Sequence, residues 1–387
     1  MNSKLVPIFL IVLVDVLGMS FIVPLLPFYA KMFGANAFTI GVLFSVFSLC
    51  QLVSGPILGK LSDQIGRKKV LLLSQAGSFL GYLILGCSHS LTTVFVARIV
   101  EGVTAGNISV AQAYMSDITS EKERTKAFSL IAAAFGIGFL IGPGISAFLF
   151  HWSYLYPIFG AMSLSGISIV TTFFLIPQQD SINPRLNQEK KFFKNGVKSA
   201  SLFILLGLFF AFQMAFSTYF SGIILYLGER FSWHGIPFGP EQVGYLFTYN
   251  GLLGTTLQLG VLSLLNRRLG EKKLILVGLF MMSLGYASLS WISKIPALVL
   301  TMTLGTIGSA VVRPTLSSRI SQESSSSRQG EIMGLMQSLT SLTQILAPLL
   351  SGYLILNHQL SLWAWIASGL AFFALLLGLK LFIIKRV

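Results

Sequence analysis

Twelve long apolar runs dominate this sequence and constrain its fold more than any other feature. A membrane-spanning helix needs about 20 mainly apolar residues, and each run is close to that length. Only 10% of the 387 residues are charged, too few to cover a soluble fold, in which about 25% is usual. The runs are also too long for the strands of a barrel. We therefore predict an all-α integral membrane protein, with spans near residues 5–29, 38–60, 70–88, 91–113, 126–148, 155–176, 200–226, 241–265, 274–292, 298–320, 329–352 and 362–384.

The basic residues indicate how these spans are oriented. Of the 27 Lys and Arg residues, 22 fall in loops or at span ends on the side of the N-terminus. Lys31, Arg230 and Lys294 fall on the other side, and Arg98 and Arg313 lie within spans. Cytoplasmic loops carry the excess of positive charge, so we expect a multi-pass protein of the plasma (inner) membrane with both termini cytoplasmic. This distribution also accounts for the net charge of +14 without a nucleic-acid partner.

The chain reads as two similar halves. Residues 1–176 and 200–387 form two predicted six-helix bundles, and the polar segment 177–199 is a predicted cytoplasmic linker. The loop after the second span, GRKKVLL from Gly66, is repeated after the eighth span as GEKKLIL from Gly270. Parallel repeats of this kind are typical of transporters whose solute site lies between the halves.

The loop GKLSDQIGRKKVLLLS (59–74) is the most specific local pattern. It resembles motif A of the major facilitator superfamily at six positions: Gly59, Leu61, Asp63, Gly66, Arg67 and Lys68. The resemblance implies a major-facilitator fold that works by alternating access. It also implies a conformational gate on the cytoplasmic side, in which Asp117 at the inner end of the fourth span pairs with Arg67.

Other segments extend the resemblance along the chain. ARIVEGVTAGN (97–107) resembles motif B, and FGIGFLIGPGISAF (135–148), with Gly138, Gly142 and Pro143, resembles the antiporter motif C. The first span, LVDVLGMSFIVPLLPFY (13–29), is similar to the twelve-span drug:proton antiporters of the tetracycline-efflux type. The third span departs from tetracycline exporters because it has no carboxylate, which argues against tetracycline itself as the solute.

Four charged residues lie well inside predicted spans, away from the span ends, namely Asp15, Arg98, Glu101 and Arg313. Each costs at least about 2.5–3.5 kcal/mol at the centre of a helix unless it is paired or hydrated. Arg98 and Glu101 are three residues apart and can touch, and Asp15 lies at a similar depth. We expect two acids to share one arginine, with Asp15 or Glu101 carrying a coupling proton. The alternative is a static ion network that holds the first and fourth spans in register.

Arg313 and several polar amide residues inside the spans are candidates for a substrate cavity. Arg313 could receive an anionic group of a substrate, or its side chain could extend to the membrane surface. For the amides, the alternative role is to hydrogen-bond neighbouring helices. The predicted cavity residues are Gln112, Gln213, Asn250, Arg313 and Gln344.

These observations favour a secondary active transporter that exports a lipophilic small molecule or drug in exchange for protons. We expect a monomer without cofactor, whose energy source is the proton gradient. A siderophore, metabolite or lysolipid carrier of the same fold, working as an importer or uniporter, is the alternative. An enzyme is disfavoured because the four histidines are scattered without metal-ligand spacing and no nucleotide-binding loop occurs; we predict no catalytic residue and no metal site.

Overall fold

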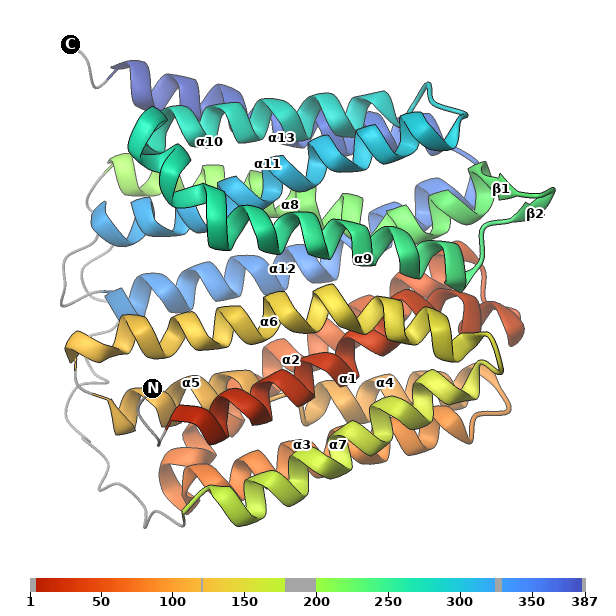
Figure 1. Cartoon of the computed structure of the whole chain (residues 1–387), viewed down its shortest axis with the longest axis vertical. Coiled ribbons are helices and arrows are strands. Elements are labelled where there is room, and N and C mark those ends of the chain that lie inside the picture. The colour runs from red at the N-terminus through yellow and green to blue at the C-terminus, as the bar shows by residue number, and fades with distance from the viewer. Residues whose placement is uncertain (1–4, 120, 178–199, 324–328, 385–387) are drawn as a thin grey trace. The chain divides into compact units, whose positions relative to one another are not determined.

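The computed structural model describes residues 5–119, 121–177, 200–323 and 329–384, and these are almost entirely helical (Figure 1). The predicted linker lies outside the described residues except for its first residue. The elements of the first part are α1 (Leu5–Met32), α2 (Ala37–Ile65), α3 (Arg67–Gly86), α4 (Leu91–Val103), α5 (Asn107–Ile118), α6 (Glu121–Phe150) and α7 (Leu155–Leu175). Those that follow are α8 (Ala200–Arg230), β1 (Ser232–Trp233), β2 (Ile236–Pro237), α9 (Pro240–Thr256), the π-helix η2 (Leu257–Val261), α10 (Leu262–Ser288), α11 (Ile295–Glu323), α12 (Gln329–Leu356) and α13 (Leu360–Ile384).

The helices confirm the predicted membrane architecture. Ten spans in the described residues are long and apolar enough to cross a bilayer, with α4 and α5 together forming one of them, Leu91–Ile118. Two further helical passes lie on either side of Gly270, whose backbone is not helical although it lies within α10. The first consists of α9, η2 and the beginning of α10, and the second is the remainder of α10. The chain is therefore an all-α, multi-pass membrane protein.

Two compact units make up the chain. The first comprises Met1–Arg185 with Phe238–Gly251, and the second comprises Leu186–Pro237 with Leu252–Val387. Within the first unit, α1 packs on α6 and α7, and α3 packs on α4 and α7. Within the second, α10 packs on α11 and α13, and α8 packs on α12 and α13. The boundary between the units falls inside α9, and the predicted bundles 1–176 and 200–387 stay a prediction.

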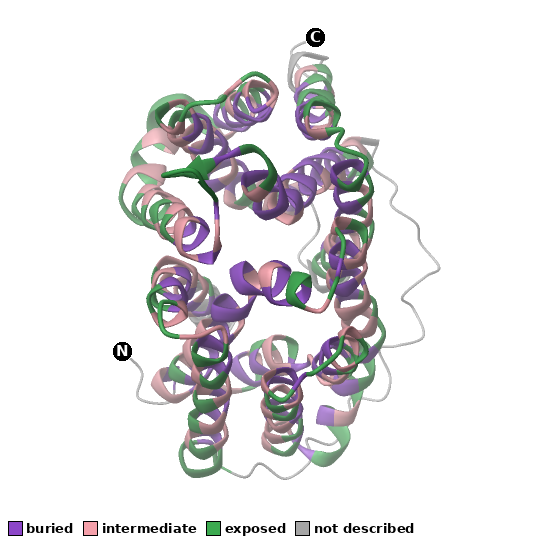
Figure 2. Cartoon of the chain, turned by 90° about the vertical axis from the view of Figure 1, so that its right-hand side faces the viewer, coloured by how far each residue is buried: buried purple, intermediate pink, exposed green. Residues whose placement is uncertain are grey.

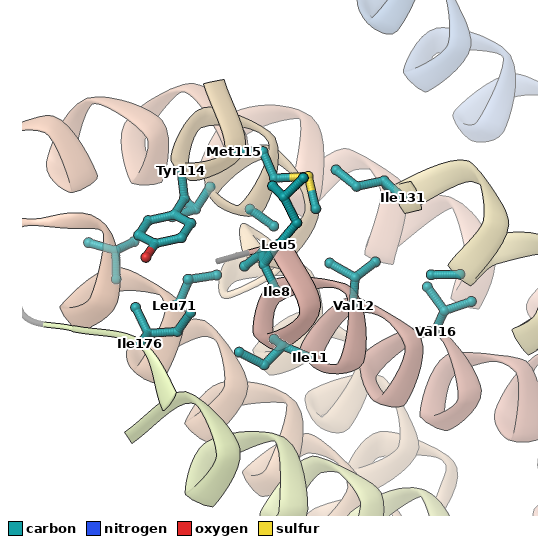
Figure 3. Packing of buried hydrophobic residues seen from close by; sticks show 14 of the residues in the cluster. Leu5, Ile8, Ile11, Val12, Val16, Leu71, Tyr114, Met115, Ile131 and Ile176 are labelled. Atoms are coloured by element: carbon teal, nitrogen blue, oxygen red, sulfur yellow. The ribbon is translucent and has the colours of Figure 1, made fainter. Parts of the chain in front are cut away.

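A continuous apolar cluster holds the first unit together. Leu5, Ile8, Val12 and Val16 lie three or four residues apart on one side of α1, and all are at most 3% exposed. Figure 3 shows these side chains gathered with residues of neighbouring helices, Ile131 among them. This spacing is the one expected for the buried face of a helix.

Other large apolar side chains remain on the surface. Figure 2 shows exposed and buried positions on the same helices. The exposed fraction reaches 61% at Phe148, 75% at Phe174, 69% at Phe203 and 75% at Leu259. Such side chains on so many helices are unfavourable in water, and lipid contact accounts for them.

The fourth span is interrupted, whereas the sequence predicts a continuous helix over 91–113. α4 ends at Val103 and α5 begins at Asn107. The hydroxyl of Thr104 donates a hydrogen bond of 2.7 Å to the carbonyl of Val100, and the Gly106 amide donates one of 2.7 Å to the carbonyl of Thr104. Side-chain bonds of this kind compete with the helical ladder. The side chains after the break therefore point in directions that differ from those predicted for one continuous helix.

Candidate functional site

Arg98 and Glu101 form a buried ion pair on α4. Their side chains contact each other directly, and the residues are only 7% and 4% exposed. The Arg98 guanidinium also lies over the ring of Phe47, 4.4 Å from its centroid, a cation–π contact that is favourable away from water. Each charge thus has its partner on the same helix.

Asp15 on α1 has a different environment. The side-chain amide of Asn107 donates a hydrogen bond of 2.9 Å to its carboxylate. Gln75 and Ser168 are further polar neighbours of this carboxylate, and the amide of Gln75 donates a bond of 2.8 Å to the Ser168 hydroxyl. All these neighbours are uncharged. Among the described side chains, no ion pair is formed with Asp15.

A small cavity of about 20 Å³ lies beside Asp15. One water molecule requires roughly 10–15 Å³ of this kind of space and two or more polar partners. The cavity therefore offers a place where a water could contact the carboxylate. Its walls come from α1, α3, α5 and α7 and consist of Val14, Asp15, Gly18, Ser78, Tyr82, Asn107, Ala161 and Ser165.

The structure separates the two acids that the sequence suggested would share Arg98. Arg98 pairs with Glu101, whereas Asp15 is bound by Asn107. A continuous helical wheel places Asn107 opposite Arg98, facing away from this site. The break between α4 and α5 is the physical reason for the difference, because it redirects the side chains of α5.

Sequence reasoning also missed the polar residues that α3 and α7 contribute. They lie at positions 75, 78 and 82 on α3 and at positions 165, 168 and 172 on α7. In both helices the spacing is three and then four residues, which places each set on one face. This periodicity inside two apolar runs was a usable signal.

The candidate gate lies at the turn between α2 and α3. Gly66 has φ 98° and ψ 144° there, a conformation open mainly to glycine. Nε of Arg67 is 2.9 Å from Asp117, and another guanidinium nitrogen is 2.5 Å from Asp63. Lys68 donates a bond of 2.7 Å to the carbonyl of Phe173. The structure thus joins the α2–α3 turn to α5 and α7. At Gly59, another residue of the predicted gate, a Cβ atom would meet nothing within 4 Å.

The glycines of the motif C segment bring α6 close to α1. A Cβ atom at Gly138 would lie 2.6 Å from Val16, and one at Gly142 would lie 1.7 Å from the Ser20 hydroxyl. The next residue, Pro143, lies inside α6 and is buried. Only glycine permits this approach of the two helices.

The predicted cavity residues belong to both units. Gln112 and Asn250 are in the first unit, and Gln213, Arg313 and Gln344 are in the second. Gln213 is 1% exposed, and its side-chain oxygen has no partner among the described residues. The guanidinium of Arg313 lies 5.3 Å from the centroid of the Phe216 ring. Gln112 is exposed, and Asn250 and Gln344 are partly buried.

The second unit contains a counterpart of the gate with the opposite charge. Gly270 has φ 73°, and Glu271 follows it where Arg67 follows Gly66. The Glu271 carboxylate accepts hydrogen bonds of 3.3 Å from Ser318 and 3.0 Å from Gln322 of α11. The sequence repeat is thus also a repeat of backbone conformation.

Comparisons with known proteins identify relatives of the whole chain. The profile of the Major Facilitator Superfamily matches residues 8–267 and 237–387. The chain is 32% identical to the class B tetracycline resistance protein of Escherichia coli, over 98% of this chain and 96% of that protein. It is 30% identical to multidrug resistance protein 2 of Bacillus subtilis (strain 168), over 90% of this chain and 88% of that protein.

Solved structures show the same fold. The human organic anion transporter MFSD10 (TETRAN) aligns with a TM-score of 0.73 at 23% identity, over 98% of this chain and 100% of that chain. A mutant of the peptide transporter POT, in complex with sulfate, aligns with a TM-score of 0.79 at 14% identity, over 99% of this chain and 94% of that chain.

Proposed function

Because the chain belongs to the Major Facilitator Superfamily, we propose that it is a proton-coupled antiporter that exports lipophilic small molecules, drugs among them, by alternating access. The family makes it a transporter of small molecules rather than an enzyme. Its resemblance to tetracycline and multidrug resistance proteins over nearly the whole chain supports drug efflux. We place it in the plasma (inner) membrane as a monomer with cytoplasmic termini, driven by the proton gradient without a cofactor.

The setting of Asp15 is the observation that carries the proposal of proton coupling. Its hydrogen-bond donor Asn107 is uncharged, so protonating the carboxylate leaves no cation without a partner. The small cavity beside it can admit the water that a proton needs for access. A change of one charge in a low-dielectric site can then bias a two-state arrangement of helices.

Glu101 is less suited to carry the proton by itself. Its protonation would leave Arg98 as an unpaired charge inside the membrane, and removing one partner of a buried ion pair is strongly unfavourable. We propose that Asp15 is the primary proton carrier and that the Arg98–Glu101 pair responds to its charge.

The contacts at the α2–α3 turn support alternating access. Arg67 joins Asp63 and Asp117, which lie on different helices. The Asp63 side chain is 53% exposed, whereas that of Arg67 is only 11% exposed. Water can therefore reach one end of this cluster, and the cluster can form and break during a transport cycle. We propose that it stabilises one conformer on the cytoplasmic side.

Arg313 supports a second candidate, a carrier of anionic aromatic solutes. Its guanidinium stacks on Phe216, and no carboxylate among the described side chains pairs with it. If these residues face the solute pathway, an aromatic carboxylate would find both a counter-charge and a stacking surface there. Transport of such anions in preference to lipophilic cations would favour this candidate.

Transport by the purified full-length protein in proteoliposomes tests the main proposal. A pH gradient with an acidic lumen should drive accumulation of ethidium, a permanently charged lipophilic cation, and nigericin should abolish it. Asp15→Asn should reduce gradient-driven accumulation to that of protein-free vesicles, because the amide cannot take up the coupling proton. Glu241→Gln is the matched control, since it neutralises an acid in the first turn of α9 and should transport as the wild type does.

Full gradient-driven activity of Asp15→Asn would remove Asp15 from the mechanism. Accumulation of ethidium that does not depend on the pH gradient would indicate a uniporter. Tetracycline and an aromatic carboxylate, measured in the same vesicles, distinguish the classes of solute.

A further inference from the structure

Tyr82 of α3 lies between Asp15, which is partly buried, and the buried Glu101. It is 7% exposed and contributes to the wall of the cavity beside Asp15. A Cβ atom at Gly18, one turn from Asp15 on α1, would lie 3.7 Å from the Tyr82 hydroxyl oxygen. One side of the phenol therefore faces the helix and the cavity of Asp15.

The other side of Tyr82 reaches Glu101. The Tyr82 hydroxyl and the Glu101 carboxylate are close enough to interact. Gly81, the neighbour of Tyr82, makes room for it, because a Cβ atom there would lie 2.2 Å from Cγ of Glu101. Two adjacent positions of α3 thus bring the acid on α4 to the phenol.

We propose that Tyr82 connects Asp15 and Glu101 into a single proton-sharing unit, so that the charge on one carboxylate controls the ion pair of the other. A tyrosine hydroxyl is both a donor and an acceptor. It can accept a proton from protonated Asp15, through a water in the cavity, while it gives its own proton to the Glu101 carboxylate. Asp15 then becomes charged, Glu101 becomes neutral, and the phenol is unchanged.

This transfer would release Arg98 from its partner. Of the contacts that Arg98 makes with described residues, the ring of Phe47 would remain, and a cation that loses its counter-charge in the membrane favours a rearrangement. Tyr82 is accordingly a positioning residue, which acts through the two acids. The inference rests on the proposed proton coupling and assigns its route.

Few other charged or titratable groups surround Asp15. The side chains that contact Asp15 are those of Asn107 from α5, Ser168 from α7 and Gln75 from α3, and none of these titrates. Tyr82 lines the cavity of Asp15, and the charges of Glu101, Arg98 and Asp15 act on its hydroxyl.

Infrared difference spectroscopy of the full-length protein in liposomes tests the connection. The carboxylic-acid band of Asp15 is identified by its loss in Asp15→Asn, and its pH midpoint is followed. Glu101→Gln should move the midpoint to lower pH, because the Tyr82 hydroxyl then no longer serves the Glu101 carboxylate and can donate, through the cavity water, to the charged form of Asp15. Residues within one network typically couple strongly enough to give a shift of about 0.5–2 pH units. In Tyr82→Phe, the same Glu101→Gln substitution should move the midpoint by less than about 0.2 pH units, below that coupling range.

Tyr29→Phe is the matched control. It removes another buried tyrosine hydroxyl between α1 and α3, which donates a bond of 2.9 Å to the carbonyl of Leu85. In Tyr29→Phe, Glu101→Gln should still move the Asp15 midpoint. A second measurement needs no change at Tyr82: by reciprocity of coupling, Asp15→Asn should move the midpoint of the Glu101 band by an equal amount.

Each outcome has one meaning. Equal shifts with and without the Tyr82 hydroxyl, or no shift in either background, overturn the role of Tyr82 and leave proton coupling at Asp15 intact. A missing reciprocal shift at Glu101 also overturns it. The absence of any band lost in Asp15→Asn defeats the proposed proton carrier itself, so the two failures can be told apart.

Discussion

A single glycine of α3, Gly81, provides the space that the buried Glu101 side chain of α4 occupies. Glu101 carries its charge inside the membrane only because Arg98 neutralises it and α3 leaves room for its side chain. That room comes from Gly81, where a Cβ atom would lie 2.2 Å from Glu101 and 3.4 Å from the carbonyl of Ala97. Gly81 is therefore required for the packing of the Glu101 side chain against α3.

Gly81→Ala should destabilise the protein by about 1–3 kcal/mol, the usual cost of an extra group in a well-packed interior. The new methyl group would force Glu101 away from Arg98 or separate α3 from α4. The measurement is thermal unfolding in detergent, followed by intrinsic fluorescence.

The control for this substitution is Gly55→Ala on α2. A Cβ atom at Gly55 would meet nothing within 4 Å, and alanine is favoured over glycine within a helix by about 1 kcal/mol. Its unfolding temperature should be unchanged or higher. An unfolding temperature of Gly81→Ala equal to that of the wild type would show that the α3–α4 packing is looser than described.

Single residues also show how far the sequence predicts the site. The contact of Arg98 with Glu101 follows from their spacing on a helix. The bond between Asn107 and Asp15 could not be predicted in that way, because its geometry depends on the break after Val103. Tyr82 could not be identified from the sequence, because a tyrosine in an apolar run gives no functional signal unless its neighbours in space are known.

At the scale of elements, the two halves share one turn. Gly66 ends α2 with φ 98°, and Gly270 interrupts α10 with φ 73° and ψ 155°. Both lie before the basic segments that the repeat aligns. Two consecutive spans can therefore meet at a sharp angle without a long loop.

Gly270→Ala should lower stability by about 1–3 kcal/mol, because this backbone region is essentially restricted to glycine. No atom lies within 4 Å of the Cβ position, so the cost comes from the backbone and not from a clash. Urea-dependent or thermal unfolding of the purified protein measures it.

Gly369→Ala on α13 provides the comparison in the same unit. Its Cβ position is also open, and its backbone is helical. Equal stabilities of Gly270→Ala and Gly369→Ala would argue against strain at the turn.

The elements that the sequence did not predict are the local departures from a helix. Length and hydropathy locate the spans because a bilayer demands about 20 apolar residues. The break before Asn107 and the π-helix Leu257–Val261 leave no such mark. Both depend on which backbone and side-chain groups form local hydrogen bonds, and apolar composition does not predict those bonds.

At the scale of the whole molecule, the outer apolar surface and the basic loops together determine how the chain is placed in a bilayer. Exposed side chains such as Phe174 and Phe203 favour lipid. The basic residues near Gly66 and Gly270 lie at loops that the orientation rule places in the cytoplasm. We therefore expect the loop after α3, which contains Cys87, to lie outside.

Labelling of cysteines tests this orientation. Cys87 is free and exposed, whereas Cys50 is partly buried, so Cys50→Ser leaves one external target. A membrane-impermeant maleimide should label this variant in right-side-out vesicles. Lys69→Cys, at an exposed position in the first turn of α3 in a chain without the two native cysteines, should react only in inside-out vesicles. Because both sites lie at opposite ends of one helix, labelling of both from the same side would contradict the orientation and with it the cytoplasmic position of the gate.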